Sequence, residues 1–255
     1  KRKPDAKPVT FTEECPECGT PLVRKEGEAA HYCPNDEGCP PQIKGKLEHF
    51  ISRRAMNIDS LGEGKIELLY DKGLVKNAAD LYDLKFEQIF GLEKIYPADL
   101  EKKERKVSFR EKTTENILKG IDASREVPFP RVLYALGIRY VGETVARKLA
   151  AHFKSMDAMM QAGFDELVAV HEIGERIAES VIAWFEKENH REIIRRLKTH
   201  GLKMEIEEEE LPKGGVLEGK TFVVSGVFEH FSRDGIKETI EQHGGKNVGS
   251  VSGNT

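Results

Sequence analysis

Four cysteines near the N-terminus have the spacing of a metal site. They are Cys15, Cys18, Cys33 and Cys39, and the 255-residue chain contains no other cysteine. A Cys-x2-Cys turn directs two thiolates toward one point, and a second pair completes the tetrahedral set that Zn²⁺ prefers. Four protein ligands leave no open coordination position, so the spacing predicts a structural zinc ion and not a catalytic one.

Two disulfide bonds are the alternative use of these four cysteines. We disfavour them because the rest of the chain is helical in pattern and large enough to fold without covalent cross-links. His31 lies near Cys33 in the sequence. Since four cysteines already complete the ligand set, we predict that His31 does not bind the metal.

Charge is balanced over most of the chain. The net charge is -4, and the acidic excess comes from residues 201–255, which carry six basic and ten acidic side chains. Nucleic-acid-binding proteins usually have a basic surplus, so DNA binding here would depend on local clusters and on backbone amides. No apolar run approaches the roughly 18 residues of a membrane span, which together with the hydrophilic composition predicts a soluble intracellular protein.

Glycine-punctuated helical patterns recur through residues 43–202, where few strands are predicted. In the clearest copy a first helix ends at Gly137, Arg139 lies in a short apolar hairpin, and a second helix opens at Gly142. This is the pattern of a helix-hairpin-helix motif. Two other segments share its rhythm, residues 58–66 and 167–178.

Hairpins of this kind are suited to binding DNA phosphates. Glycine lets the backbone approach the anion, and the free N–H groups of the second helix point at it with the helix dipole behind them. Such contacts hold the sugar–phosphate backbone without reading bases. A helical array that packs glycines against its own helices is the alternative. The residues predicted to contact DNA in and beside these three copies are Arg53, Arg54, Gly62, Gly64, Lys65, Gly137, Arg139, Gly142 and Gly174.

A degraded fourth copy is expected between residues 66 and 133. A plausible leading helix (84–92) and trailing helix (115–121) are separated by a charged insertion, residues 93–106. The hairpin slot, residues 107–112, contains no glycine, so its phosphate contact should be weak, lost, or made by the side chains of Arg110 and Lys112. A bulky residue at Gly142 should strain the backbone and displace the phosphate, whereas a change at Phe109 should matter little.

The pattern changes again after an acidic segment that ends at Gly215. Residues 221–226 predict a buried strand, Ser232 is a good N-cap for a helix through His243, and the turn at Gly244 and Gly245 leads to a second strand. Later core elements of such an α/β module are absent before residue 255, so we expect this end to be truncated or poorly ordered.

The order of these parts resembles the C-terminal half of bacterial NAD-dependent DNA ligase. Three strings carry the resemblance, residues 50–56, 133–139 and 244–252. It implies a mainly α fold: a four-cysteine zinc finger, a helical domain of four helix-hairpin-helix motifs, and a truncated α/β BRCT module. The implied division is the tail of an OB-fold domain (1–12), the zinc finger (13–42), the helix-hairpin-helix domain (43–202), an acidic linker (203–215) and the start of the BRCT module (216–255).

The resemblance also implies a function for the parent protein. An NAD-dependent DNA ligase would carry its adenylation domain, with the NAD and Mg²⁺ sites, outside this chain, so the chain alone should be inactive. This part would grip nicked double-stranded DNA during replication and repair, and the BRCT module could contact protein or DNA. A monomer in the bacterial cytoplasm, associated with the nucleoid, is expected.

Two other functions stay open at this point. The chain could be a non-catalytic DNA-repair scaffold with the same modules. It could instead belong to a nuclease or topoisomerase, although no clustered carboxylates or nucleophilic tyrosine setting stands out.

Overall fold

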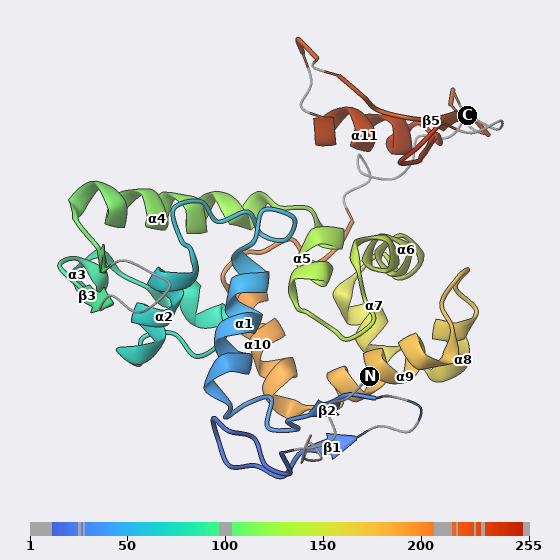
Figure 1. Ribbon diagram of the computed structural model, residues 1–255. Helices are drawn as coiled ribbons and strands as arrows, with labels where there is room; N and C mark the ends of the chain where they lie inside the picture. The colour runs from blue at the N-terminus through green and yellow to red at the C-terminus, as the bar shows by residue number, and fades with distance from the viewer. Residues whose placement is uncertain are drawn as a thin grey trace, which may run out of the picture.

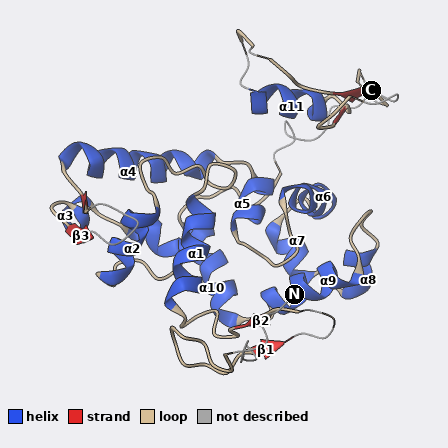
Figure 2. Cartoon of the chain, in the orientation of Figure 1, coloured by secondary structure: helices blue, strands red, loops and turns tan. Residues whose placement is uncertain are grey.

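A computed structural model describes residues 12–24, 27, 29–96, 104–206, 216–217, 219–226, 228–230 and 233–251 of the chain. This part of the chain is mainly helical, with three separate two-stranded sheets (Figures 1 and 2). None of its helices combines the length and apolar character that a membrane span requires. The predicted OB-fold tail falls almost entirely on residues 1–11, which lie outside the described residues.

The zinc finger consists of turns around one small sheet. Strand β1 (Val23–Arg24) pairs antiparallel with β2 (His31–Tyr32). Helix α1 (Pro40–Ile51) follows directly on Cys39, with a proline in its first turn where no N–H group is needed. The last cysteine is therefore fixed to the start of the helical domain.

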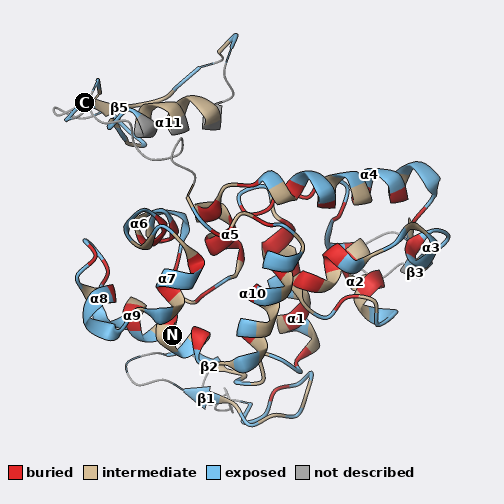
Figure 3. Cartoon of the chain, turned by 180° about the vertical axis from the view of Figure 1, so that it is seen from behind, coloured by how far each residue is buried: buried red, intermediate tan, exposed pale blue. Residues whose placement is uncertain are grey.

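The helical domain is built around α1. Its core is one continuous cluster that includes Leu47 and Phe50 of α1 and Phe129 of α5. Figure 3 shows the buried positions concentrated on α1, α2 and α5. The remaining elements are α2 (Glu63–Asp71), the 3₁₀ helix η1 (Ala78–Asp83), α3 (Phe86–Ile89), α4 (Glu111–Ala123), the 3₁₀ helix η2 (Ser124–Glu126), α5 (Phe129–Ala135), α6 (Glu143–Phe153), α7 (Met156–Gln161), α8 (Phe164–Val168), α9 (Glu175–Phe185) and α10 (Glu188–Thr199).

We number the hairpins in chain order: the first at residues 58–66, the second at the degraded copy, the third at Gly137 to Gly142, and the fourth at residues 167–178. The charged insertion of the second hairpin forms a β-ribbon. Strand β3 (Glu93–Tyr96) pairs antiparallel with β4 (Arg105–Ser108). The predicted leading helix shrinks to the single turn of α3, and the trailing helix begins at Glu111, four residues earlier than expected. The predicted hairpin slot at 107–112 is therefore wrong, because its first residues belong to β4 and its last to α4.

The helical domain extends beyond its predicted end. Leu202 and Met204 are buried, and the Met204 carbonyl accepts a hydrogen bond of 2.8 Å from the Met156 N–H group. Ile206 donates its N–H group to the Lys154 carbonyl, also at 2.8 Å. The predicted linker at 203–215 thus starts too early, since residues 203–206 pack on the helices.

The C-terminal unit contains one β–α–β arrangement. Strands β5 (Thr221–Phe222) and β6 (Lys246–Asn247) pair in parallel, with α11 (Arg233–Gln242) between them in the sequence. The helix begins at Arg233 and ends at Gln242, one residue before the predicted end, and Ser232, the predicted N-cap, lies outside the described residues. A Cβ at Gly245 would meet the side chains of Ile240 at 2.6 Å and Phe222 at 2.9 Å, so only glycine fits this contact.

Candidate nucleic-acid interface and metal centre

The four cysteine thiols converge on one point. Their sulfur atoms all lie within 4.8 Å of one another, with Cys15 and Cys39 at 3.9 Å and Cys18 and Cys33 at 3.5 Å. Thiolates at the corners of a zinc tetrahedron, each about 2.3 Å from the ion, lie roughly 3.8 Å apart. All four cysteines are free thiols, so the disulfide alternative is not realised. The donor set fits Zn²⁺, and the exposed His31 is not part of it.

Local backbone contacts hold the first pair of thiols in place. Gly19 has a φ of +68°, which a residue without a Cβ adopts readily, and its N–H group donates to the Cys15 carbonyl at 2.8 Å. A hydrogen bond with the Thr20 hydroxyl lowers the pKa of Cys18 to about 6. Burial instead raises the pKa of Cys33 to about 12, and the charge of a bound cation would deprotonate this thiol.

Three hairpins share one backbone conformation. Each trailing helix is capped by an extended glycine, and the residue directly before that glycine is buried. The residue two positions before the glycine has a left-handed backbone although it is not glycine. These left-handed residues are Ser60, Tyr140 and Glu172, with φ of 65°, 65° and 66°. The buried ones are Leu61, Val141 and Ile173, and the capping glycines are Gly62, Gly142 and Gly174. The repeat inferred from the sequence is thus a repeat of geometry.

The space beside these three capping glycines is open. A Cβ at Gly62, Gly142 or Gly174 would meet no atom within 4 Å, and the φ values of -121°, -80° and -86° suit any residue. The expectation that a bulky residue strains the backbone at Gly142 is therefore wrong. Serine or aspartate would cap these helices at least as well. Neither strain nor packing requires glycine at these three positions.

Other glycines of the domain have structural roles. Gly137 ends α5 with a φ of +67°, and Gly64 is buried inside α2. A Cβ on Gly120 of α4 would lie 3.1 Å from the Asp59 carbonyl oxygen. The alternative in which glycines serve packing thus holds for Gly120, and helix α4 passes close to the first hairpin there.

The second hairpin has the same closing hydrogen bond as the third, at the base of its ribbon. The Phe109 N–H group donates to the Leu92 carbonyl at 2.8 Å, as Val141 does to Ile138 at 3.0 Å in the third hairpin. Gly91, with a φ of +80°, then matches Gly137. By this correspondence β3 and β4 stand where Arg139 and Tyr140 form the tip of the third hairpin.

This correspondence changes two sequence predictions. Phe109 is fully buried at the position of Val141, so a change there cannot be harmless. Arg110 takes the place of the capping glycine, and both Arg110 and Lys112 are exposed at the start of α4. The second copy does contain a glycine, Gly91, which the sequence assignment missed because the ribbon separates it from α4.

Helix α5 joins the first hairpin to the third. The Arg131 side chain donates to the Arg53 carbonyl at 2.7 Å and to the Ala55 carbonyl at 3.0 Å. Arg54 forms an ion pair of 3.4 Å with Glu143, the first residue of α6. The exposed side chain of Arg54 therefore lies beside the N-terminal end of α6. An open hollow of about 660 Å³, lined by Arg53 among others, adjoins the first hairpin.

Two predicted DNA contacts are engaged elsewhere. The Lys65 ammonium donates to the Ser60 carbonyl, and burial lowers its pKa. The Arg139 guanidinium lies over the ring of Tyr32 in the zinc finger, 4.6 Å from its centroid, and 5.0 Å from that of Tyr140. The hydroxyl of Ser180 in α9 donates to the Arg139 carbonyl at 2.8 Å, which ties the third hairpin to the fourth.

Family models match three parts of the chain. Residues 14–40 match the NAD-dependent DNA ligase C4 zinc finger domain, residues 131–194 a helix-hairpin-helix motif, and residues 212–255 the BRCT domain. The matches occur in the order predicted from the sequence. They confirm the mainly helical architecture with a zinc finger before it and a BRCT segment after it.

Curated relatives agree with these matches along nearly the whole chain. Proteins named DNA ligase from Phocaeicola vulgatus and Parabacteroides distasonis are 54% and 53% identical over 97% of the chain, which covers 35% of each relative. A DNA ligase from Christiangramia forsetii is 50% identical over the full chain, which covers 36% of that protein. The chain thus spans little more than a third of these relatives. Over that span it is similar to DNA ligases, and residues 14–40 match the zinc finger of the NAD-dependent ones.

Proposed function

We propose that this chain is the DNA-gripping part of an NAD-dependent DNA ligase. It holds a nicked duplex by its phosphates, while the adenylation domain, with NAD and Mg²⁺, seals the nick from another part of the protein. The observation that carries the proposal is the set of three open glycine caps with one backbone geometry. The relatives named DNA ligase favour this role over a non-catalytic repair scaffold.

The residues of the chain bind phosphate in two ways. At Gly62, Gly142 and Gly174 the first-turn N–H groups and the helix dipole face the anion, and a Cβ on each glycine would meet no atom within 4 Å. At the second hairpin Arg110 and Lys112 replace this backbone contact with charged side chains. Both kinds of contact are made to the sugar–phosphate backbone of DNA, so they are independent of base sequence.

Zinc has a structural part in this function. Cys15, Cys18, Cys33 and Cys39 would hold the ion with all four coordination positions filled, so it supplies folding free energy to a segment with little core of its own. The reacting groups of the nick are handled elsewhere in the protein.

Binding to a nicked duplex tests the proposal directly. The chain should bind unrelated nicked sequences with similar affinity, and the affinity should fall steeply as salt rises because phosphate contacts release counterions. Incubation with labelled NAD should leave the chain unlabelled, since the adenylated lysine lies elsewhere. Failure to bind any duplex at low salt would refute the DNA-binding role, and a labelled chain would refute the division of labour. Light scattering of the free chain should report a monomer.

A further inference from the structure

The loop between the last two cysteines reaches across to the helical domain. Tyr32 directly precedes Cys33, and Asp36 lies between Cys33 and Cys39. The Tyr32 side chain contacts Arg139 of the third hairpin, and the Asp36 side chain contacts Lys187 at the start of α10. We call the pairs Asp36–Lys187 and Tyr32–Arg139 the latch.

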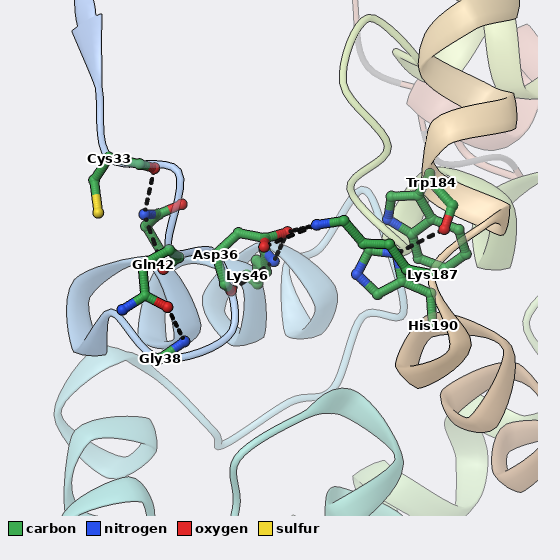
Figure 4. A network of polar contacts seen from close by, with 9 residues as sticks. Cys33, Asp36, Gly38, Gln42, Lys46, Trp184, Lys187 and His190 are labelled. Carbon is green, nitrogen blue, oxygen red and sulfur yellow. Dashed lines mark hydrogen bonds and ion pairs between the residues drawn. The ribbon is translucent and has the colours of Figure 1, made fainter. Parts of the chain in front are cut away.

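The Asp36 carboxylate is held by two lysines from different helices (Figure 4). Lys187, at the start of α10, donates to both carboxylate oxygens at 2.8 Å. Lys46 of α1 donates to one carboxylate oxygen at 3.1 Å and to the Asp36 carbonyl at 2.8 Å. The Asp36 side chain is only 27% exposed, so solvent screens this pair less than an ion pair at the open surface.

The second contact involves the tip of the third hairpin. The Arg139 guanidinium lies against both the Tyr32 and the Tyr140 rings, a geometry that favours cation–π attraction. Tyr140 is the left-handed residue that sets the path of the backbone toward Gly142. Arg139 is thus held between the zinc finger and the residue that positions the phosphate-binding turn.

Open space lies beside the contacts between the zinc finger and this hairpin. A hollow of about 500 Å³ is lined by Asp36 and Lys187 and also by Arg139 and Tyr140. The latch pairs therefore meet beside open space and not within a packed core. Each pair should be separable by a single substitution without loss of the core.

The loop between Cys33 and Cys39 is held partly by helix α1. Gln42 of α1 donates to the Cys33 carbonyl at 2.9 Å and to the Asn35 carbonyl at 3.3 Å, which fixes one side of the loop to α1. The described residues 33–39 belong to no strand. Tyr32 itself belongs to β2. A metal ion that joins Cys33 and Cys39 would add a restraint on the loop that contains Asp36 and on Cys33, the neighbour of Tyr32.

We propose that Tyr32 and Asp36 are positioning residues that couple zinc binding to the phosphate grip of the third hairpin at Gly142. This inference rests on the proposed DNA-binding function. Coupling between two ligands is reciprocal, so if zinc strengthens DNA binding, DNA must equally strengthen zinc binding.

Zinc release to a chromogenic chelator tests the coupling without any activity assay. A nicked duplex should slow release from the parent chain at least about threefold, and removal of zinc should weaken duplex binding by at least the same factor. In a Tyr32→Ala, Asp36→Asn double variant the duplex should no longer change the release rate. Tyr32→Phe keeps the ring and should behave like the parent.

Two further variants keep the result interpretable. Glu17→Gln removes one exposed carboxylate from the same zinc finger and should leave the coupling intact. Lys187→Met removes one of the two latch pairs from the helical side and leaves the zinc finger unchanged, so it should weaken the coupling even if the double variant fails to retain zinc. A parent chain that binds no duplex would refute the proposed function. A parent chain that binds duplex but releases zinc at one rate with and without it would overturn the latch alone, as would undiminished coupling in Lys187→Met.

Discussion

Replacing Gly142 by valine separates DNA binding from folding. The backbone at Gly142 has φ -80° and ψ 177°, a conformation that valine adopts readily, and no atom lies within 4 Å of the new Cβ. Valine is a poorer helix cap than glycine, which costs on the order of 1 kcal/mol, and it reduces the entropy of the unfolded chain by about 0.4–1 kcal/mol. The two effects oppose each other, so the free energy of unfolding should change by less than about 1 kcal/mol.

The effect on DNA binding should be much larger. The valine side chain would occupy the space through which a phosphate reaches the first N–H groups of α6. Loss of one hydrogen bond to a charged group costs about 1.5–3 kcal/mol, which is a reduction in affinity of roughly 10- to 150-fold. Because the lost contact is to the backbone of DNA, all duplex sequences should weaken to the same degree.

Gly163→Val is the matched control for this experiment. Gly163 caps α8 with nearly the same backbone, φ -81° and ψ 172°, but its N–H group already donates to the Glu166 carboxylate at 2.9 Å. Its helix, α8, is also the short leading helix of the fourth hairpin. Gly163→Val should therefore bind DNA like the parent chain.

Fluorescence anisotropy with a labelled nicked duplex measures both affinities, and circular dichroism with urea titration checks the fold. A folded Gly142→Val chain that binds within twofold of the parent would contradict the hairpin assignment. Equal losses in Gly142→Val and Gly163→Val would show that any helix cap matters and that the open glycines have no special role.

Three other outcomes follow from the structure. Phe109→Ala should lower the free energy of unfolding by about 3–5 kcal/mol, measured by urea denaturation, because Phe109 is fully buried. Elemental analysis should find about one zinc per chain, and a strong chelator should remove the protection of residues 14–40 from protease. Burial raises the pKa of Asp36, but hydrogen bonds from Lys187 and Lys46 outweigh it and hold that pKa below its usual value. The stabilisation by Asp36 should thus be complete above about pH 4, the pKa of an unfolded aspartate, and be lost as the pH falls through the folded pKa, so that the difference in unfolding free energy between parent and Asp36→Asn disappears at acid pH.

Features that depend on local spacing could be predicted from the sequence. The zinc site follows from the positions of Cys15, Cys18, Cys33 and Cys39 because two turns bring the thiols together. The capping roles of Gly142 and Gly174 follow from where apolar helical patterns restart.

Features that depend on contacts between distant residues could not be predicted from the sequence. Tyr140 and Glu172 adopt left-handed backbones, which their residue types do not favour, so only the shared distance from the capping glycine could have indicated them. The pairing of Asp36 with Lys187 joins segments far apart in the chain and leaves no pattern in either. The closing hydrogen bond of the second hairpin was missed because the ribbon separates Leu92 from Phe109.

The closure of that ribbon also bears on how such motifs can be lengthened. The hydrogen bond between the Phe109 N–H group and the Leu92 carbonyl lies at the base of β3 and β4. Because this bond holds the two ends of the ribbon together, the separation of α3 and α4 does not depend on the ribbon residues beyond it. A segment that leaves and returns as an antiparallel pair can be spliced in at this point whatever its length, because the helices on either side keep their separation. The ribbon of the second hairpin is thus an insertion point at which an epitope or a fluorescent tag could be grafted beside the proposed DNA-binding surface, without loss of the helical scaffold.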